Sequence, residues 1–99
     1  MSDYKVYVDS ALEDLIPGFL ANREEELEEL KGLFAAKNFE ALREMGHTIK
    51  GIGGGYGFDL MTELGQQIEE AAEQEETEAV NQLIEELEDY IKNVEIIYE

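Results

Sequence analysis

The sequence contains no cysteine, a single proline and a single histidine, and it has no long hydrophobic run. Without cysteine the chain has no disulfide, no thiol nucleophile and no thiolate ligand for zinc. No apolar run approaches the roughly 20 residues that a membrane span needs. The N-terminal residues 1–9 lack the successive charged, apolar and cleavage regions of a secretory signal. We therefore expect a cytoplasmic protein without a membrane segment.

Basic residues are scarce as well. Seven Lys and Arg stand against 25 Asp and Glu, which gives the chain a net charge of −18. A surface this acidic repels the phosphate backbone of nucleic acids and the head groups of anionic lipids. We therefore expect neither nucleic acid nor a membrane surface as a partner.

Helix-forming residues dominate the 99 residues, a length that supports one core and therefore one domain over residues 1–99. Apolar residues recur at steps of three and four along four long stretches. These apolar positions span residues 16–34, 39–56, 60–72 and 80–98. Because each helix must bury its apolar stripe against the others, we expect an all-α fold: an antiparallel, up-and-down four-helix bundle.

The ends of these helices carry recognisable signals. Asp9 or Ser10 is the expected N-cap of a short extra helix that packs across one end of the bundle, and Asp59 and Thr77 are the expected N-caps of the last two long helices. Residues 1–9 include an alternating, strand-like segment, but a lone strand has no partner in a helical bundle. We therefore expect an extended lead-in there.

The histidine, His47, lies on the polar face of the second long stretch. With Ile49 pointing to the core and about 100° per residue, His47 lies about 160° from Ile49 and faces solvent. The same outer face carries Arg43, Glu44, Lys50, Gly51 and Gly54. Two of the seven basic residues therefore flank the histidine of a strongly acidic chain.

The outward glycines, Gly51 and Gly54, need a reason, because each costs roughly 1 kcal/mol relative to alanine inside a helix. Their missing side chains leave room for a large partner above the imidazole. An uncharged imidazole offers a lone pair, and a lysine ammonium beside it stabilises an incoming phosphoryl group. The face therefore suits phosphoryl acceptance. A solvated histidine followed by a flexible glycine loop explains the composition equally well.

The run His47-Thr48-Ile49-Lys50-Gly51, followed six residues later by Gly57, resembles the signature of the histidine-containing phosphotransfer (HPt) domain, His-x-Leu-Lys-Gly-x5-Gly, with isoleucine in place of leucine. The resemblance extends over essentially the whole chain, and includes the segments 15–20 and 64–69. It implies a phosphorelay intermediate in which His47 accepts a phosphoryl group from a receiver-domain aspartate and passes it to another receiver aspartate. The implied partners are response-regulator receiver domains and a hybrid sensor histidine kinase.

The resemblance also implies roles for neighbouring residues. Lys50 would offset phosphoryl charge, and Gly51 would keep the approach open. Arg43 and Gly54 lie on the same face and are expected to line the access of the receiver. Glu69, where many family members have glutamine, would hold the other ring nitrogen and so fix the tautomer. A structural salt bridge is an equally good interpretation of Glu69.

We expect no cofactor and no metal site in the chain itself, since the Mg²⁺ of the reaction would come from the receiver. No phosphate-binding Gly-x-x-x-x-Gly-Lys-Ser/Thr loop is present in the sequence. We therefore expect a phosphocarrier without kinase activity rather than an enzyme. Polar outer faces favour a monomer.

Two other functions stay open at this point. Glu44 and His47 form a Glu-x-x-His pair, the unit from which di-iron carboxylate bundles build their sites, although such a site needs two pairs and hence a dimer of this chain. The chain could also be an acidic adaptor in which His47 is incidental.

Overall fold

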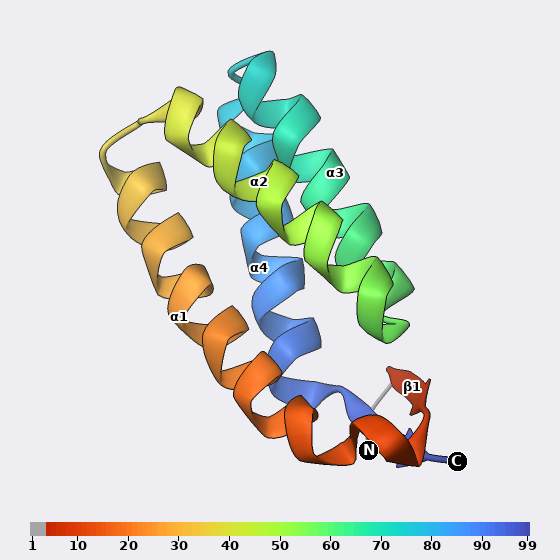
Figure 1. Cartoon of the computed structure of the whole chain (residues 1–99). Coiled ribbons are helices and arrows are strands. Elements are labelled where there is room, and N and C mark those ends of the chain that lie inside the picture. The colour runs from red at the N-terminus through yellow and green to blue at the C-terminus, as the bar shows by residue number, and fades with distance from the viewer. Residues whose placement is uncertain (1–3) are drawn as a thin grey trace.

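The computed structural model describes residues 4–99 of the chain (Figure 1). The elements in chain order are β1 (Lys5–Val8), the 3₁₀ helix η1 (Ser10–Leu15), α1 (Ile16–Ala35), α2 (Phe39–Gly53), the 3₁₀ helix η2 (Gly54–Tyr56), α3 (Asp59–Glu73), α4 (Thr77–Asn93) and β2 (Glu95–Tyr98). The first three residues of the expected lead-in, 1–3, lie outside the described residues.

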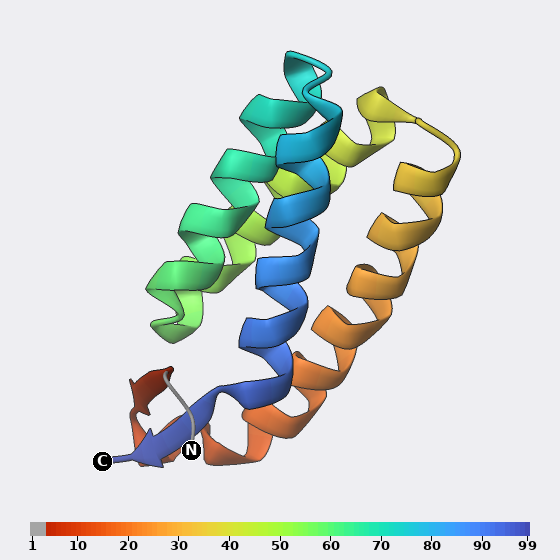
Figure 2. The same cartoon turned by 180° about the vertical axis from the view of Figure 1, so that it is seen from behind.

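The four long helices form a bundle in which each helix runs opposite to the one before it (Figures 1 and 2). Short connections join them at residues 36–38, 54–58 and 74–76. Lys37 and Glu75 adopt left-handed backbone conformations there, with φ of 56° and 53°, and so reverse the chain within a few residues. The arrangement confirms the predicted antiparallel, up-and-down four-helix bundle, and η1 is its short extra helix.

Each long helix contributes fully buried side chains to one core. Representative residues with an exposed fraction of 0% are Leu30 of α1, Leu42 of α2, Ile68 of α3 and Val80 of α4. Burying an aliphatic side chain of this size contributes about 1.5–3 kcal/mol. The pair α2 and α3 packs most closely, and the two helices lie side by side in both views of the ribbon (Figures 1 and 2).

The prediction of an unpaired lead-in over residues 1–9 is wrong. β1 pairs in parallel with β2, with Lys5 opposite Glu95 and Val8 opposite Tyr98. The side chains of β1 alternate between exposed and buried, and Val8 is only 2% exposed. The strand therefore has a partner from the other end of the sequence, and its apolar side chains belong to the core.

The same pairing corrects the end of the last helix, because the apolar spacing over residues 80–98 predicts helix to the end of that stretch. α4 ends at Asn93, and Val94 has an extended backbone with a ψ of 132°. The amide of Glu95 donates a hydrogen bond to the carbonyl of Tyr4, at 2.9 Å. Strand pairing replaces the helical hydrogen bonds that these residues would otherwise make.

The helix starts agree with the sequence to within one residue. Asp9 caps η1, since its Oδ1 accepts a hydrogen bond from the amide of Ala11 at 2.9 Å. Asp59 and Thr77 are the first residues of α3 and α4 rather than their N-caps. Phe58 and Glu76 occupy the N-cap positions, and neither side chain makes a capping hydrogen bond. Asp59 instead places a carboxylate in the first turn, where the helix dipole favours it.

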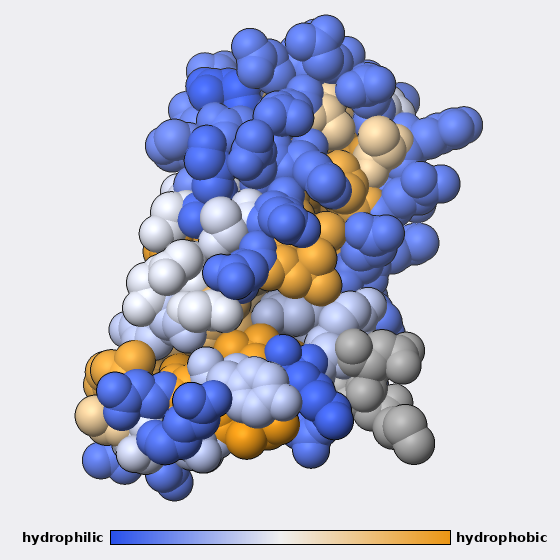
Figure 3. Space-filling view, turned by 90° about the vertical axis from the view of Figure 1, so that its right-hand side faces the viewer, coloured by the Kyte–Doolittle hydropathy of each residue, from blue (hydrophilic) through white to orange (hydrophobic). Residues whose placement is uncertain are grey.

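The surface is largely hydrophilic. Figure 3 shows one face on which hydrophilic side chains predominate in the upper part, with hydrophobic groups exposed between them along the middle and again at the lower end, near β1. Some surface charges link helices. Lys31 of α1 donates a hydrogen bond to Glu88 of α4 at 2.6 Å, and Lys92 donates a second one to Glu88 at 2.9 Å. These two ammonium groups lower the pKa of Glu88 to about 2. Within residues 4–99, none of the helices is both long enough and apolar enough to span a membrane.

Candidate functional site

His47 lies in the middle of α2, a helix whose sequence fixes both its ends and its orientation. The Oδ1 atom of Asn38 caps the helix by accepting a hydrogen bond from the amide of Ala41 at 3.2 Å. Glu40 in the first turn and Lys50 in the last turn match the helix dipole. The buried face of α2 consists of Leu42, Gly46, Ile49 and Gly53. The His47 side chain therefore points outward, as the spacing predicts, and is 66% exposed.

Glu69 of α3 reaches across to both functional side chains of α2. Its Oε2 atom lies 3.0 Å from Nδ1 of His47, and its Oε1 atom lies 3.6 Å from Nζ of Lys50. The Glu69 side chain is only 19% exposed, so the contact is sheltered on the carboxylate side. The two interpretations of Glu69, a hydrogen bond to the imidazole and a salt bridge, therefore occur together in one structure.

The contact determines which ring nitrogen is available. An ionised carboxylate only accepts hydrogen bonds, so Nδ1 carries the hydrogen in this pair. In the neutral ring the lone pair is then on Nε2. Among residues 4–99, no side chain or backbone group hydrogen-bonds to Nε2. The site therefore presents a nucleophilic nitrogen to solvent.

The glycines of the outer face leave the space above the imidazole open. Gly51 is exposed, and a Cβ atom built on it would have no atom within 4 Å, apart from its own helix backbone and its chain neighbours. Gly54 is also exposed, and its Cβ would only approach Oγ1 of Thr62 at 3.8 Å. The chain then turns at Gly57, whose φ of 84° lies in the left-handed region that favours glycine.

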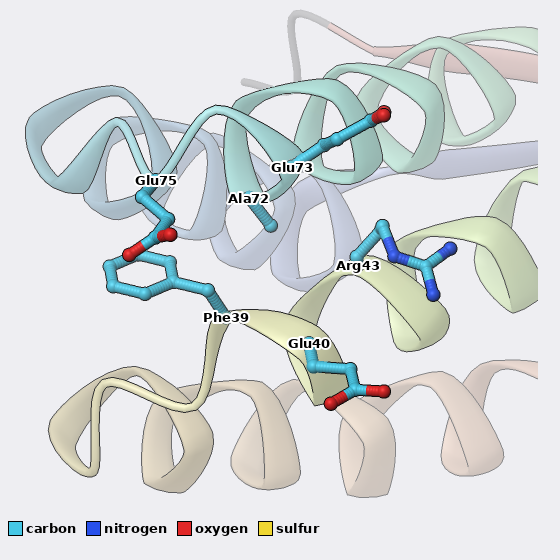
Figure 4. A pocket seen from close by; sticks show the side chains of 6 residues that line it. All are labelled: Phe39, Glu40, Arg43, Ala72, Glu73 and Glu75. Atoms are coloured by element: carbon cyan, nitrogen blue, oxygen red, sulfur yellow. The ribbon is translucent and has the colours of Figure 1, made fainter.

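Arg43 lies one turn before His47 on α2 and is half-buried. Figure 4 shows it at a shallow hollow between the start of α2 and the end of α3. The residues that line this hollow are Phe39, Glu40, Arg43, Ala72, Glu73 and Glu75. Arg43 and Lys50 thus place two cations on either side of His47, while the acidic side chains near Arg43 keep the hollow itself polar.

Gly65, to which the sequence alone gives no role, lies in the interior of α3 and is buried against α2. A Cβ atom at Gly65 would lie 2.5 Å from the backbone nitrogen of Lys50. The available signal was the cost of a glycine inside a helix, about 1 kcal/mol relative to alanine. This cost indicates that Gly65 has a structural reason, but it does not show which helix packs against the residue.

Within residues 4–99, no group of three or more His, Asp and Glu side chains is arranged to hold a metal ion. Glu44, the partner of His47 in the Glu-x-x-His pair, is exposed, and its backbone carbonyl accepts a hydrogen bond from Thr48 at 3.1 Å. The carboxylate that lies beside the imidazole comes from α3 instead.

Comparison with known proteins identifies the family to which the chain belongs. The family model described as the Hpt domain matches residues 14–96, which include every element from α1 to α4 and all of the site residues described above. Neither the curated proteins nor the solved structures contain a match to the chain. Since the family model covers most of the sequence, the chain belongs to the Hpt domain family, whose members carry phosphoryl groups on histidine.

Proposed function

We propose that this chain is a phosphorelay intermediate in which His47 accepts a phosphoryl group from the aspartyl phosphate of a receiver domain and returns it to the aspartate of another receiver. The observation that carries the proposal is the exposed imidazole whose Nδ1 lies 3.0 Å from the Glu69 carboxylate. It supplies the two properties that a phosphoacceptor needs, which are an accessible lone pair and a fixed ring orientation.

In the proposed step, the lone pair of Nε2 attacks the phosphorus atom of the aspartyl phosphate. The N–P bond forms as the P–O bond to the aspartate breaks, and the aspartate leaves as a carboxylate. The ring keeps the hydrogen on Nδ1, so the phosphorylated imidazole carries a positive charge. Glu69 lies within hydrogen-bonding distance of that Nδ1 and stabilises this charge. The return transfer reverses the same steps.

Lys50 supports the step by charge. Lys50 lies one turn from His47 on the same helix, and its side chain is 38% exposed, so its ammonium group can turn from Glu69 toward an incoming phosphoryl group. Phosphoryl transfer depends mainly on in-line positioning and on cations that offset the charge of the phosphoryl oxygens. This chain contributes the nucleophile and the ammonium, and the receiver would contribute the aspartate and its Mg²⁺.

The proposal is tested by mixing the protein with Mg²⁺ and a receiver domain that a small phosphodonor has already phosphorylated. We expect one phosphoryl group on the tryptic peptide that contains His47, and we expect acid to release it while alkali does not. The control is incubation with ATP and Mg²⁺ alone, which should leave the protein unmodified. An acid-stable phosphoryl group on Ser, Thr or Tyr, or no transfer from any of several receivers, would contradict the proposal.

The open space at Gly51 leads to a prediction in which activity and stability change in opposite directions. Replacing Gly51 with leucine should raise helix stability by up to about 1 kcal/mol, because leucine is the better helix former. The same side chain should obstruct the receiver and slow phosphoryl transfer at limiting receiver concentration. Urea unfolding and the rate of label transfer measure the two effects separately.

Gly32 offers a matched control for this substitution. It is an exposed glycine of α1, and a Cβ built on it also meets no atom within 4 Å, again apart from its own helix and chain neighbours. Gly32→Leu should stabilise the helix without slowing transfer. If Gly51→Leu transfers phosphoryl groups at the wild-type rate, the receiver does not approach over Gly51.

A further inference from the structure

Two glycines bring the backbones of α2 and α3 into direct contact beside His47. A Cβ atom at Gly46 would lie 2.7 Å from the backbone nitrogen of Glu69 and 2.8 Å from the carbonyl oxygen of Gly65. A Cβ atom at Gly65 would lie 2.5 Å from the backbone nitrogen of Lys50 and 2.8 Å from the carbonyl oxygen of Gly46. All of these neighbours are backbone atoms, so they cannot move aside by changing a rotamer.

The contact is reciprocal and centred on the site. Gly46 precedes His47 and lies one turn before Lys50 on α2, while Gly65 lies one turn before Glu69 on α3. Each glycine packs against the backbone of the site residue on the opposite helix. The distance between the two helix axes at this point therefore sets how far Glu69 must reach to the imidazole.

We propose that Gly46 and Gly65 are positioning residues, which hold Glu69 at hydrogen-bonding distance from Nδ1 of His47 by allowing the two helix backbones to touch. The consequence for transfer rests on the proposed function, whereas the consequence for the imidazole ring does not. A methyl group at position 65 requires the helices to separate by about 1 Å before its contacts become ordinary. Added to the present 3.0 Å between Nδ1 and Oε2, that separation exceeds the range of a hydrogen bond.

The test measures the tautomer of the neutral His47 ring by nitrogen NMR at mildly alkaline pH, which needs no assignment because the chain has one histidine. We expect the wild type to show the Nδ1–H tautomer. Gly65→Ala and Gly46→Ala should each shift the population toward Nε2–H. Each should also slow phosphoryl acceptance about tenfold or more, by analogy with metal-ligating histidines, for which loss of the orienting partner typically costs about 10–100-fold.

Two control variants separate positioning from general damage to the fold. Gly53→Ala belongs to the same helix interface, but its Cβ meets Thr62 and Phe58 instead of the site residues. It should lower the melting temperature and leave the tautomer unchanged. In a Glu69→Ala background, Gly65→Ala should have no further effect on the tautomer, because the glycine acts through Glu69.

The inference is overturned if Gly65→Ala and Gly46→Ala are folded and keep the wild-type tautomer, or if Gly53→Ala alters the tautomer as much as they do. Trimethylamine oxide is added to keep overpacked variants folded, since it favours the compact state.

An independent measurement on the wild type is the nuclear Overhauser effect between the Cα hydrogens of Gly65 and the amide hydrogen of Lys50. Its absence also refutes the inference. If the wild type accepts no phosphoryl group, the proposed function fails, while the tautomer still decides the role of the glycines.

Discussion

The His47→Gln protein is expected to leave a phosphorylated receiver fully phosphorylated. Label transfer to the variant should be no higher than the loss of label seen without the protein. Glutamine approximates the size and polarity of histidine, but its amide nitrogen is not a nucleophile. Because the His47 side chain is 66% exposed, its replacement should leave the helical content and the unfolding free energy close to those of the wild type. Loss of label from the receiver over time measures the effect directly.

The matched control is Glu44→Gln, a substitution on the same outer face of α2, three residues before His47. It should transfer at close to the wild-type rate. Transfer to His47→Gln at that rate would refute the assignment of the phosphoacceptor. An acidic adaptor would instead bind the receiver equally well before and after the substitution and would take no label in either form, an outcome that a binding measurement on the same samples detects.

Val8→Asp should cause the largest loss of stability among the substitutions considered. Val8 is 2% exposed in β1, and an aspartate there would be a buried charge without a partner. Such a charge costs about 3–5 kcal/mol, a large share of the stability of a domain of this size. Urea unfolding followed by circular dichroism measures the change.

Tyr7→Asp is the control on the same strand. Tyr7 neighbours Val8, points to the opposite side of the strand and is 59% exposed. Its replacement should cost no more than about 1 kcal/mol, the range of strand propensities. If the two variants lost equal stability, or if neither lost any, β1 would not be packed in solution as it is in the structure.

The helices and the orientation of His47 could be predicted because both follow from local periodicity. Apolar steps of three and four residues place Ile49 inward, and the geometry of the helix then places His47 outward. The helix starts at Asp59 and Thr77 were predicted to within one residue, since residues of these types are favoured at the cap and an acidic residue such as Asp59 is also favoured in the first turn.

The strand pair could not be predicted, because its two strands lie at opposite ends of the sequence and their pairing depends on where the bundle places them. The segment Glu95–Tyr98 continues the apolar spacing of α4, so the sequence itself favours more helix there. Only the presence of β1 alongside supplies the alternative hydrogen bonds. Residues this far apart give no periodic signal.

The site shows the same division between local and long-range information. The exposure of Lys50 and Gly51 follows from the helix wheel, but the contact of Glu69 with His47 joins two helices and came only from the family resemblance. The sequence shows Gly65 as a glycine inside a predicted helix, but it does not show that the backbone of α2 packs against it. Which residues meet across a helix interface depends on the crossing geometry, and one sequence does not specify that.

The pairing of β1 with β2 makes the described chain a closed loop in space. Beyond the ladder itself, the amide of Ser10 donates to the carbonyl of Glu99, and the amide of Glu99 donates to the carbonyl of Val8, both at 2.9 Å. The start of α1 and the end of α4 are therefore joined through the strand pair, so that separating either end from the other requires these hydrogen bonds to break. Chain ends usually unfold locally before the rest of a domain. Because the β1–β2 pair joins both ends of the described chain, we expect them to unfold together with the bundle.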